Sequence, residues 1–171
     1  MAPNQRYPHN ARSFFTDRIR RDIGGGIVLW RGYFQSVRPA IGRILINVDT
    51  ATGVMYKPGR LMDLALEFLG RSGQPNALSP RFGLPERRRM QLQHFLSGIK
   101  VTTAHSPHHR GRTRLVKKLT RLGARDLTFE VDEGQTMTVA DFFRTRYNRT
   151  LLYPDVICVE VCVLSPCPGY V

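Results

Sequence analysis

The segment T-V-A-D-F-F-R-T-R-Y, residues 138–147, has the pattern of a short capped helix. Thr138 can act as the N-cap, because its hydroxyl can accept a hydrogen bond from the backbone of the first turn. Asp141 lies three positions later, where a carboxylate can hydrogen-bond back to the cap residue and interacts favourably with the positive end of the helix dipole. The segment therefore predicts a helix that starts at a defined residue.

Aromatic and basic side chains lie close together along this predicted helix. Phe142 lies four residues before Arg146. Phe143 lies four residues before Tyr147, and such pairs are neighbours on a helix surface. Rings stack on bases and guanidinium groups meet phosphates, so the element suits single-stranded nucleic acid. An ordinary amphipathic helix, with phenylalanines in a core and arginines in solvent, has the same pattern. The segment alone leaves both interpretations open.

The charge of the chain is unevenly distributed. The 171 residues carry a formal net charge of +13. Thirteen basic residues and one acidic residue, Glu86, lie between Arg71 and Arg125, whereas residues 126–171 are net acidic. A concentrated basic block favours an anionic partner, most often nucleic acid. A solubilising surface or a membrane-surface patch is the alternative, which a uniform spread of charge would favour.

Other classes of protein find little support in the sequence. The longest nearly apolar run, residues 156–164, is far shorter than the roughly 20 residues of a membrane span. The polar first ten residues are unlike a signal peptide. Cys158, Cys162 and Cys167 are odd in number and form no C-x-x-C pair, which argues against a disulfide framework and a structural zinc. We expect a reducing, cytoplasmic setting and no membrane partner.

Metal and catalytic sites are also weakly supported. His105, His108 and His109 have no nearby carboxylate or cysteine, so a solvated basic turn is favoured over a metal site. No nucleophile elbow is present. The three glycines at 24–26 precede a predicted strand, whereas a phosphate-binding loop follows one. The sequence predicts no enzyme, no metal and no cofactor.

The first half of the chain predicts strands followed by helices. Composition and alternation predict a loop over 1–21, a strand over 27–38 that Pro39 ends, a strand over 41–48, a turn over 49–53 and a strand over 54–56. Apolar stripes predict helices over 60–69 and 85–96. The stretch 71–85 is rich in Gly, Pro and Ser, and is the candidate domain boundary.

The second half predicts short strands around the helix at 138–147. These strands are expected over 99–105, 112–119, 126–131, 151–153 and 156–164. Several short strands with one inserted helix indicate a small barrel or curled sheet. The fold class is therefore α+β.

The order of several motifs resembles a known family. G-G-G-I-V-L-W-R-G-Y-F-Q-S-V-R-P (24–39) and R-I-L-I-N-V-D-T-A-T-G-V-M-Y-K-P (43–58) resemble the first linker domain of Argonaute proteins, and A-R-S-F-F-T (11–16) resembles the segment before it. Four later motifs resemble the PAZ domain in order and spacing: I-K-V-T-T-A-H (99–105), D-L-T-F-E (126–130), V-A-D-F-F-R-T-R-Y-N (139–148) and L-L-Y-P-D-V-I-C-V-E-V (151–161). The linker motif distinguishes the chain from the PAZ-bearing Dicer proteins.

The resemblance implies an architecture and a function. It implies the end of an N-terminal region over 1–22, a linker 1-like domain of strands and one helix over 23–71, and a PAZ-like domain over 72–171. The PAZ domain is expected to be an OB-like β-barrel with an inserted hairpin-and-helix appendage. Its pocket would hold the two-nucleotide 3′ end of a single-stranded small guide RNA in RNA-mediated gene silencing.

The resemblance also implies site residues. Five residues would contact the terminal RNA backbone: His105, Arg112, Phe142, Arg146 and Tyr147. Phe129 would pack against the last base. Arg114 falls where a tyrosine is common in the family, and its guanidinium can still meet phosphate. The family usually has a tyrosine at the position of Phe142, so one phosphate-directed hydroxyl is lost.

The end of the sequence departs from the family pattern. After Val161 it reads C-V-L-S-P-C-P-G-Y-V, where the family would continue into another barrel strand, a second linker and the slicer domains. We expect a fragment whose barrel can lack its closing strand, with the remaining Argonaute domains as partners if a longer protein exists. Two alternatives stay open: a general basic binder of single strands without end preference, and a scaffold whose basic face meets an acidic protein.

Overall fold

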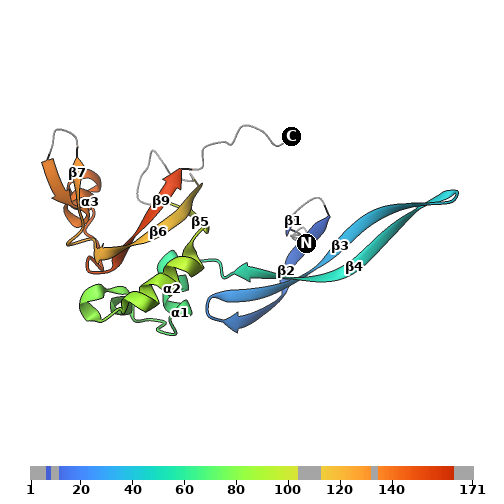
Figure 1. Cartoon of the computed structure of the whole chain (residues 1–171), viewed down its shortest axis with the longest axis horizontal. Coiled ribbons are helices and arrows are strands. Elements are labelled where there is room, and N and C mark those ends of the chain that lie inside the picture. Colours follow the sequence, from blue (N-terminus) through green and yellow to red (C-terminus); the bar gives the residue numbers. More distant parts are fainter. Residues whose placement is uncertain (1–6, 9–11, 104–112, 132–134, 164–171) are drawn as a thin grey trace. The chain divides into compact units, whose positions relative to one another are not determined.

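The chain folds as two compact units, Met1–Arg60 and Leu61–Val171 (Figure 1). The structure is a computed structural model and describes residues 7–8, 12–103, 113–131 and 135–163. Within these ranges, no helix has both the length and the apolar character needed to cross a membrane.

The first unit is a four-stranded antiparallel sheet. Its strands are β1 (Tyr7–Pro8), β2 (Ser13–Gly24), β3 (Ile27–Ala40) and β4 (Arg43–Tyr56), in the order β1-β2-β3-β4. Phe15 and Val28 are its buried apolar residues. A Cβ atom at Gly32 would lie 2.0 Å from the carbonyl oxygen of Phe14, so only glycine allows β2 and β3 to approach this closely.

Three sequence predictions for this unit are wrong. A loop was predicted over 1–21, but residues 13–24 form β2. This Arg-rich segment is a strand because it pairs with one side of β3. Pro39 lies within β3 opposite Ile44, where its missing N–H costs little because β2 no longer covers that side of the strand. The predicted turn at 49–53 is continuous strand, since β3 supplies a partner for every residue of β4.

The second unit begins with helices. These are α1 (Leu61–Phe68), the short 3-10 helices η1 (Pro75–Leu78) and η2 (Pro80–Phe82), and α2 (Glu86–Leu96). Both predicted α-helices are confirmed to within a residue or two. The helix α1, which the expected boundaries place in the linker domain, packs in the core of the second unit. The boundaries themselves stay predictions.

Strands of the second unit form two separate sheets. β5 (Lys100–Thr102), β6 (Thr113–Gly123) and β9 (Ile157–Val163) form one antiparallel sheet in the order β5-β6-β9. β7 (Thr128–Val131) and β8 (Gln135–Thr138) form a hairpin that leads into α3 (Val139–Tyr147). β8 was not predicted, and the predicted strand at 151–153 is wrong because these residues are irregular, with a bend at Leu152, and lead into a turn before β9.

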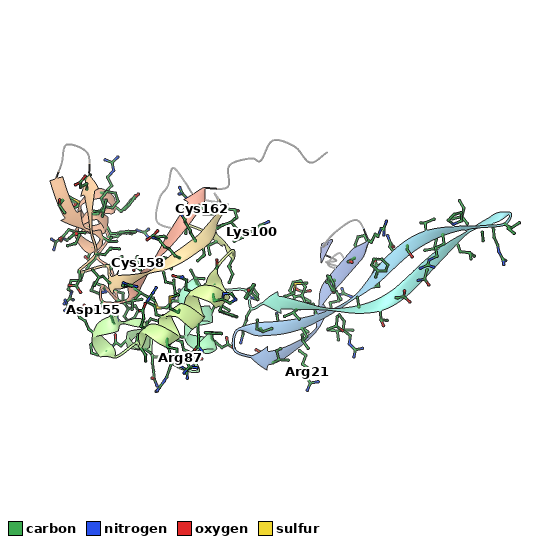
Figure 2. All side chains as sticks on the ribbon, in the orientation of Figure 1. Arg21, Arg87, Lys100, Asp155, Cys158 and Cys162 are labelled. Carbon is green, nitrogen blue, oxygen red and sulfur yellow. The ribbon has the colours of Figure 1, made fainter. Side chains whose placement is uncertain are left out.

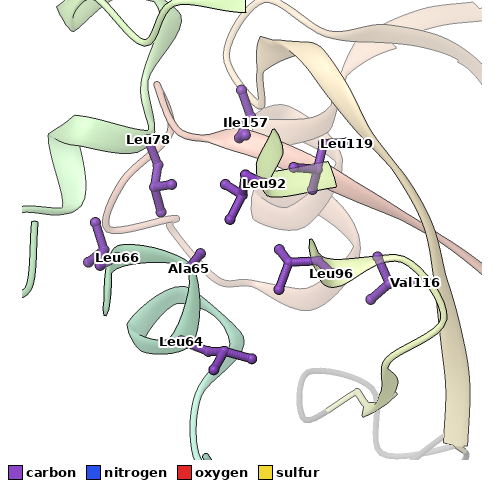
Figure 3. Close-up of a cluster of buried hydrophobic side chains, with 9 residues drawn as sticks. All are labelled: Leu64, Ala65, Leu66, Leu78, Leu92, Leu96, Val116, Leu119 and Ile157. Atoms are coloured by element: carbon purple, nitrogen blue, oxygen red, sulfur yellow. The ribbon is translucent and has the colours of Figure 1, made fainter. Parts of the chain in front are cut away.

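The core of the second unit joins its helices to its larger sheet. Nine buried side chains contribute: Leu64, Ala65, Leu66, Leu78, Leu92, Leu96, Val116, Leu119 and Ile157 (Figure 3). Arg89 on α2 is also buried, and its guanidinium donates to Glu86 and to the carbonyl oxygen of Leu119 on β6. A buried guanidinium needs such partners, and the bond to Leu119 joins α2 to β6.

The α+β class predicted from the sequence is confirmed. Helices and strands are mixed, and the β7–β8 hairpin with α3 matches the expected hairpin-and-helix appendage (Figure 1). In the described part of the chain, the strands form open sheets of four, three and two strands. Closure into an OB-like barrel therefore stays a prediction.

Candidate nucleic-acid interface

The helix α3 is held at both ends by local hydrogen bonds. The hydroxyl of Thr138 accepts from the backbone N–H of Asp141 at 3.1 Å and donates to the Asp141 carboxylate at 2.8 Å. Asn148 ends the helix in a left-handed conformation, with φ of 48°. The predicted N-cap is confirmed, and it fixes the residue at which α3 begins.

Four rings from β7 and α3 form an aromatic cluster, which consists of Phe129, Phe142, Phe143 and Tyr147. Phe142 meets Phe129 edge-to-face at 5.2 Å between centroids and Tyr147 at 5.8 Å, with interplanar angles of 76° and 83°. Phe143 contacts Tyr147 at 5.4 Å. Such arrangements are the preferred ones for aromatic pairs. The cluster therefore joins the hairpin to the helix.

The aromatic cluster keeps ring surface in contact with solvent. Phe129 is 36% exposed, and the other three rings are half-buried. No residue of α3 is fully buried, and Val139 and Phe143 are half-buried. α3 packs on a two-stranded hairpin, which is too narrow to cover a full helix face.

The basic side chains of α3 differ in their pairing. Arg144 donates to the carboxylate of Asp141 at 2.8 Å, which neutralises part of its charge. Arg146 is exposed and has no ion pair with any residue the structure describes. Arg149, just after the helix, is also exposed. Arg146 and Arg149 are therefore available to an anionic ligand at the C-terminal end of α3.

The other three predicted site residues, Arg114, His105 and Arg112, do not belong to the hairpin or to α3. Arg114 is half-buried on β6, in a different sheet from Phe129, and pairs in register with Val101 and Val163. Its Nε atom is buried without a hydrogen-bond partner among the described residues. His105 and Arg112 lie outside the described residues. The structure thus brings together Phe129, Phe142, Arg146 and Tyr147 on the hairpin and α3.

Further basic residues lie along β6. Lys117 is exposed. Lys118 pairs with Glu160 at 3.3 Å and Arg121 with Glu86 at 3.6 Å, so both are partly neutralised. On α2, Arg87 is exposed near the start of the helix (Figure 2). Apart from the buried Arg89 and the half-buried Arg114, the described basic residues of the block are exposed and lie on several elements.

An ion-pair network holds the base of the hairpin. Arg81 on η2 donates to both carboxylate oxygens of Asp126, at 3.1 and 2.6 Å, two residues before β7 begins. These bonds raise the pKa of Arg81. Asp155, before β9, lies 3.7 Å from Arg81 and 3.4 Å from Arg125. The network was not predicted, because its members are far apart in sequence and carry no motif.

The described residues form no metal-binding group. Within those ranges, no three His, Cys, Asp or Glu side chains gather where an ion could bind. Cys158 and Cys162 are unoxidised thiols on β9 (Figure 2), and burial raises the pKa of the Cys158 thiol. The three histidines at 105, 108 and 109 lie outside the described residues, so the solvated-turn interpretation stays a prediction.

Comparisons with known proteins bear on this arrangement. A model of the Argonaute linker 1 domain matches residues 11–57, and a model of the PAZ domain matches residues 76–165. Protein argonaute 1D of Oryza sativa subsp. japonica is 30% identical over 162 residues. That match covers 93% of this chain and 15% of the relative, so the chain spans a small part of its length.

Solved structures give similar matches. An Argonaute of Kluyveromyces polysporus, solved with a guide RNA, is 17% identical with a TM-score of 0.52, over 94% of this chain and 20% of that chain. The PAZ domain of Drosophila Argonaute 2, solved to explain 3′ end recognition of nucleic acids, is 29% identical with a TM-score of 0.41. This second match covers 62% of this chain and 85% of that one.

The two domain matches fall in the same order as the two structural units. The linker 1 match covers the four-stranded sheet from just before β2 to just after β4. The PAZ match begins in η1 and extends past β9, and it includes the aromatic cluster. The chain belongs to the Argonaute family, of which it carries the linker 1 and PAZ domains.

Proposed function

We propose that this chain binds the 3′ end of single-stranded guide RNA, as the linker 1 and PAZ portion of an Argonaute in RNA-mediated gene silencing. The observation that carries the proposal is the aromatic cluster, in which the partly exposed ring of Phe129 lies on the same appendage as Arg146. A ring can stack on a base of any sequence, and a guanidinium can hold the adjoining phosphate.

Each predicted site residue has a role in this proposal. Phe129 packs against the last base, since it is the most exposed ring of the cluster. Arg146 and Tyr147 meet the terminal phosphates. His105, Arg112 and Arg114 contribute further contacts to the backbone, as the family resemblance implies. The buried Nε of Arg114 supports its part, because an unpaired buried donor gains most from an incoming acceptor.

Phe142 gives the site a distinctive chemistry. It contacts all three other rings of the aromatic cluster, so its main effect is to orient Phe129 and Tyr147. The family usually supplies a tyrosine hydroxyl here. Without it, the hydroxyl of Tyr147 makes the larger contribution to phosphate binding, and the affinity for RNA is lower than a tyrosine would give.

The proposal also covers the cellular location, the cofactors and the partners of the protein. We propose that the chain acts in the cytoplasm, has no enzymatic activity, and needs no cofactor. The remaining Argonaute domains are its proposed protein partners where a longer protein exists. A pocket that contacts the terminal ribose would prefer RNA to DNA, because only RNA carries the 2′-hydroxyl.

A second candidate is a general binder of single strands without end preference. It is favoured by exposed basic residues away from the aromatic cluster, such as Lys117 and Arg87. Circular and linear forms of the same single-stranded RNA separate the two functions, because a circle offers no end. In a fluorescence titration at fixed salt, the proposed function predicts much weaker binding of the circle. Equal binding of the two forms would establish the general binder.

A further inference from the structure

The tip of the β3–β4 hairpin extends beyond the rest of its sheet (Figure 1). The last paired residues of β2 and β3 are Ser13 and Phe34, whereas β3 and β4 remain paired to Ala40 and Arg43. The tip is therefore a two-stranded ribbon. A two-stranded ribbon is only marginally stable alone in water and gains stability from additional strands.

One edge and one face of this ribbon are apolar and open. Ile44, Ile46 and Val48 alternate along β4 and are 72%, 70% and 58% exposed. β4 is the edge strand of its sheet in the part of the chain that the structure describes, and its pairing with β3 has no bulge. It contains no proline and no lysine, the residues that commonly protect an edge. Its outer backbone groups can therefore pair with another strand.

The sequence of β4 is complementary to itself in one antiparallel register. When Ile46 lies opposite Ile46 of a second copy, Ile44 lies opposite Val48, and Arg43 lies opposite Asp49. Opposed apolar side chains and opposed charges both stabilise cross-strand pairs. The two-fold symmetry forms the Ile44–Val48 and Arg43–Asp49 contacts twice and places the Ile46–Ile46 contact on the axis.

Neighbouring symmetric registers lack this match. A shift that places Leu45 at the centre puts Arg43 opposite Asn47. The opposite shift, centred on Asn47, puts Leu45 opposite Asp49. Of these three registers, only the one centred on Ile46 pairs Arg43 with Asp49 while it pairs Ile44 with Val48 and Ile46 with itself, and it places Leu45 opposite Asn47.

We propose that the open edge of β4 binds the same edge of a second copy of this chain, through residues 43–49 in antiparallel register centred on Ile46. The two sheets become continuous across the two-fold axis. The contact is short, so the dimer is weak and depends on protein concentration in the range of about 1–100 µM.

Sedimentation of the full chain tests this proposal. The wild-type protein should approach twice the monomer mass by about 100 µM. Ile46→Lys places two ammonium groups opposite each other at the axis and should weaken the dimer at least about tenfold. Val54→Lys is the matched control, because Val54 is 66% exposed on the same strand but outside the paired segment. It should leave the mass unchanged, and unchanged circular dichroism confirms that each variant folds.

A charge exchange tests the register itself. Arg43→Asp and Asp49→Arg each place like charges opposite each other and should each weaken the dimer about fivefold or more, whereas the double variant restores the pairing. A wild-type protein that stays monomeric at about 100 µM overturns the proposal. So does a dimer that responds equally to Ile46→Lys and Val54→Lys, or a double variant as weak as the single ones.

Discussion

The ring of Phe142 on α3 meets the ring of Phe129 on β7 edge-to-face, with 5.2 Å between their centroids. This contact joins two elements between which β8 lies in the sequence. The Phe142 ring holds the Phe129 side chain in one orientation, while 36% of the surface of Phe129 stays exposed. A ring that is both exposed and held in place can stack on a base with little further loss of side-chain entropy.

Removal of the exposed ring should weaken RNA binding. Stacking on a base contributes about 1–3 kcal/mol, so Phe129→Ala should lower the affinity for single-stranded RNA roughly five- to hundredfold. Fluorescence anisotropy with a labelled RNA measures the change. Phe82→Ala is the control, because Phe82 is also exposed in the second unit but lies outside the aromatic cluster. An equal loss in both variants would contradict a role specific to Phe129.

Restoration of the missing hydroxyl should strengthen RNA binding. A hydrogen bond to a charged phosphate contributes about 1.5 kcal/mol, so Phe142→Tyr should raise the affinity up to about tenfold. Phe143→Tyr places a hydroxyl on the adjacent ring and should give no gain. The same titration compares both variants with the wild type. A gain from Phe143→Tyr that matches that from Phe142→Tyr would show that the position of the hydroxyl is unimportant.

The two arginines of α3 should differ in their contribution to salt dependence. Arg146 has no ion pair among the described residues, whereas Arg144 is bound to Asp141. Each phosphate neutralised on a single strand contributes about −0.7 to the slope of log K against log salt. Arg146→Ala should therefore reduce the slope by about that amount, and Arg144→Ala by clearly less. Titrations at several salt concentrations measure both slopes, and identical slopes would rule out the assignment of Arg146.

The N-cap of α3 should contribute to the stability of the second unit. Thr138 accepts from the backbone N–H of Asp141, and loss of such a cap costs about 1 kcal/mol. Urea unfolding of Thr138→Ala measures the change in the free energy of unfolding. Thr150→Ala, which truncates an exposed threonine beyond the helix, serves as control and should change it little. A neutral Thr138→Ala variant would show that α3 is held by its ring contacts alone.

Acid should weaken the ion pair between Glu86 and Arg89 on α2. The hydrogen bonds from Arg89 lower the pKa of Glu86 below its ordinary value of 4.5. Their stabilising effect is therefore present above pH 4.5 and is lost as the pH falls through the lowered pKa. Urea unfolding at about pH 7 and about pH 3 should show a smaller loss of stability for Glu86→Gln than for the wild type. Glu130→Gln, at an exposed position, should behave like the wild type.

Local signals in the sequence were enough to predict α3. Its cap, its acidic first turn and its four-residue ring spacing are all contained within ten residues, and the structure places the helix at Val139–Tyr147. The same signals did not show that Phe143 contacts other rings and stays half-buried. That outcome depends on the narrow hairpin beneath the helix, which the spacing of residues within α3 does not encode.

Longer-range pairing explains the errors in the first unit. The segment around Asp49 and Gly53 has the composition of a turn, yet it is strand because β3 offers an unbroken partner. The polar, Arg-rich residues of β2 likewise form a strand because one side of β3 was available. In both cases the tertiary partner overrides local preference. The network of Arg81, Asp126 and Asp155 escaped prediction for the same reason.

Recognition of an RNA end is the main feature of the proposed function, and a single titration can test it. A short single-stranded RNA is prepared with a free 3′ hydroxyl and, separately, with a bulky group on its 3′ end. The wild-type chain should bind the free end at least about tenfold more tightly, because the block removes the stacking of the last base on Phe129. Phe129→Ala should lose most of this difference. Equal affinity of the wild-type chain for the two RNAs would contradict the account.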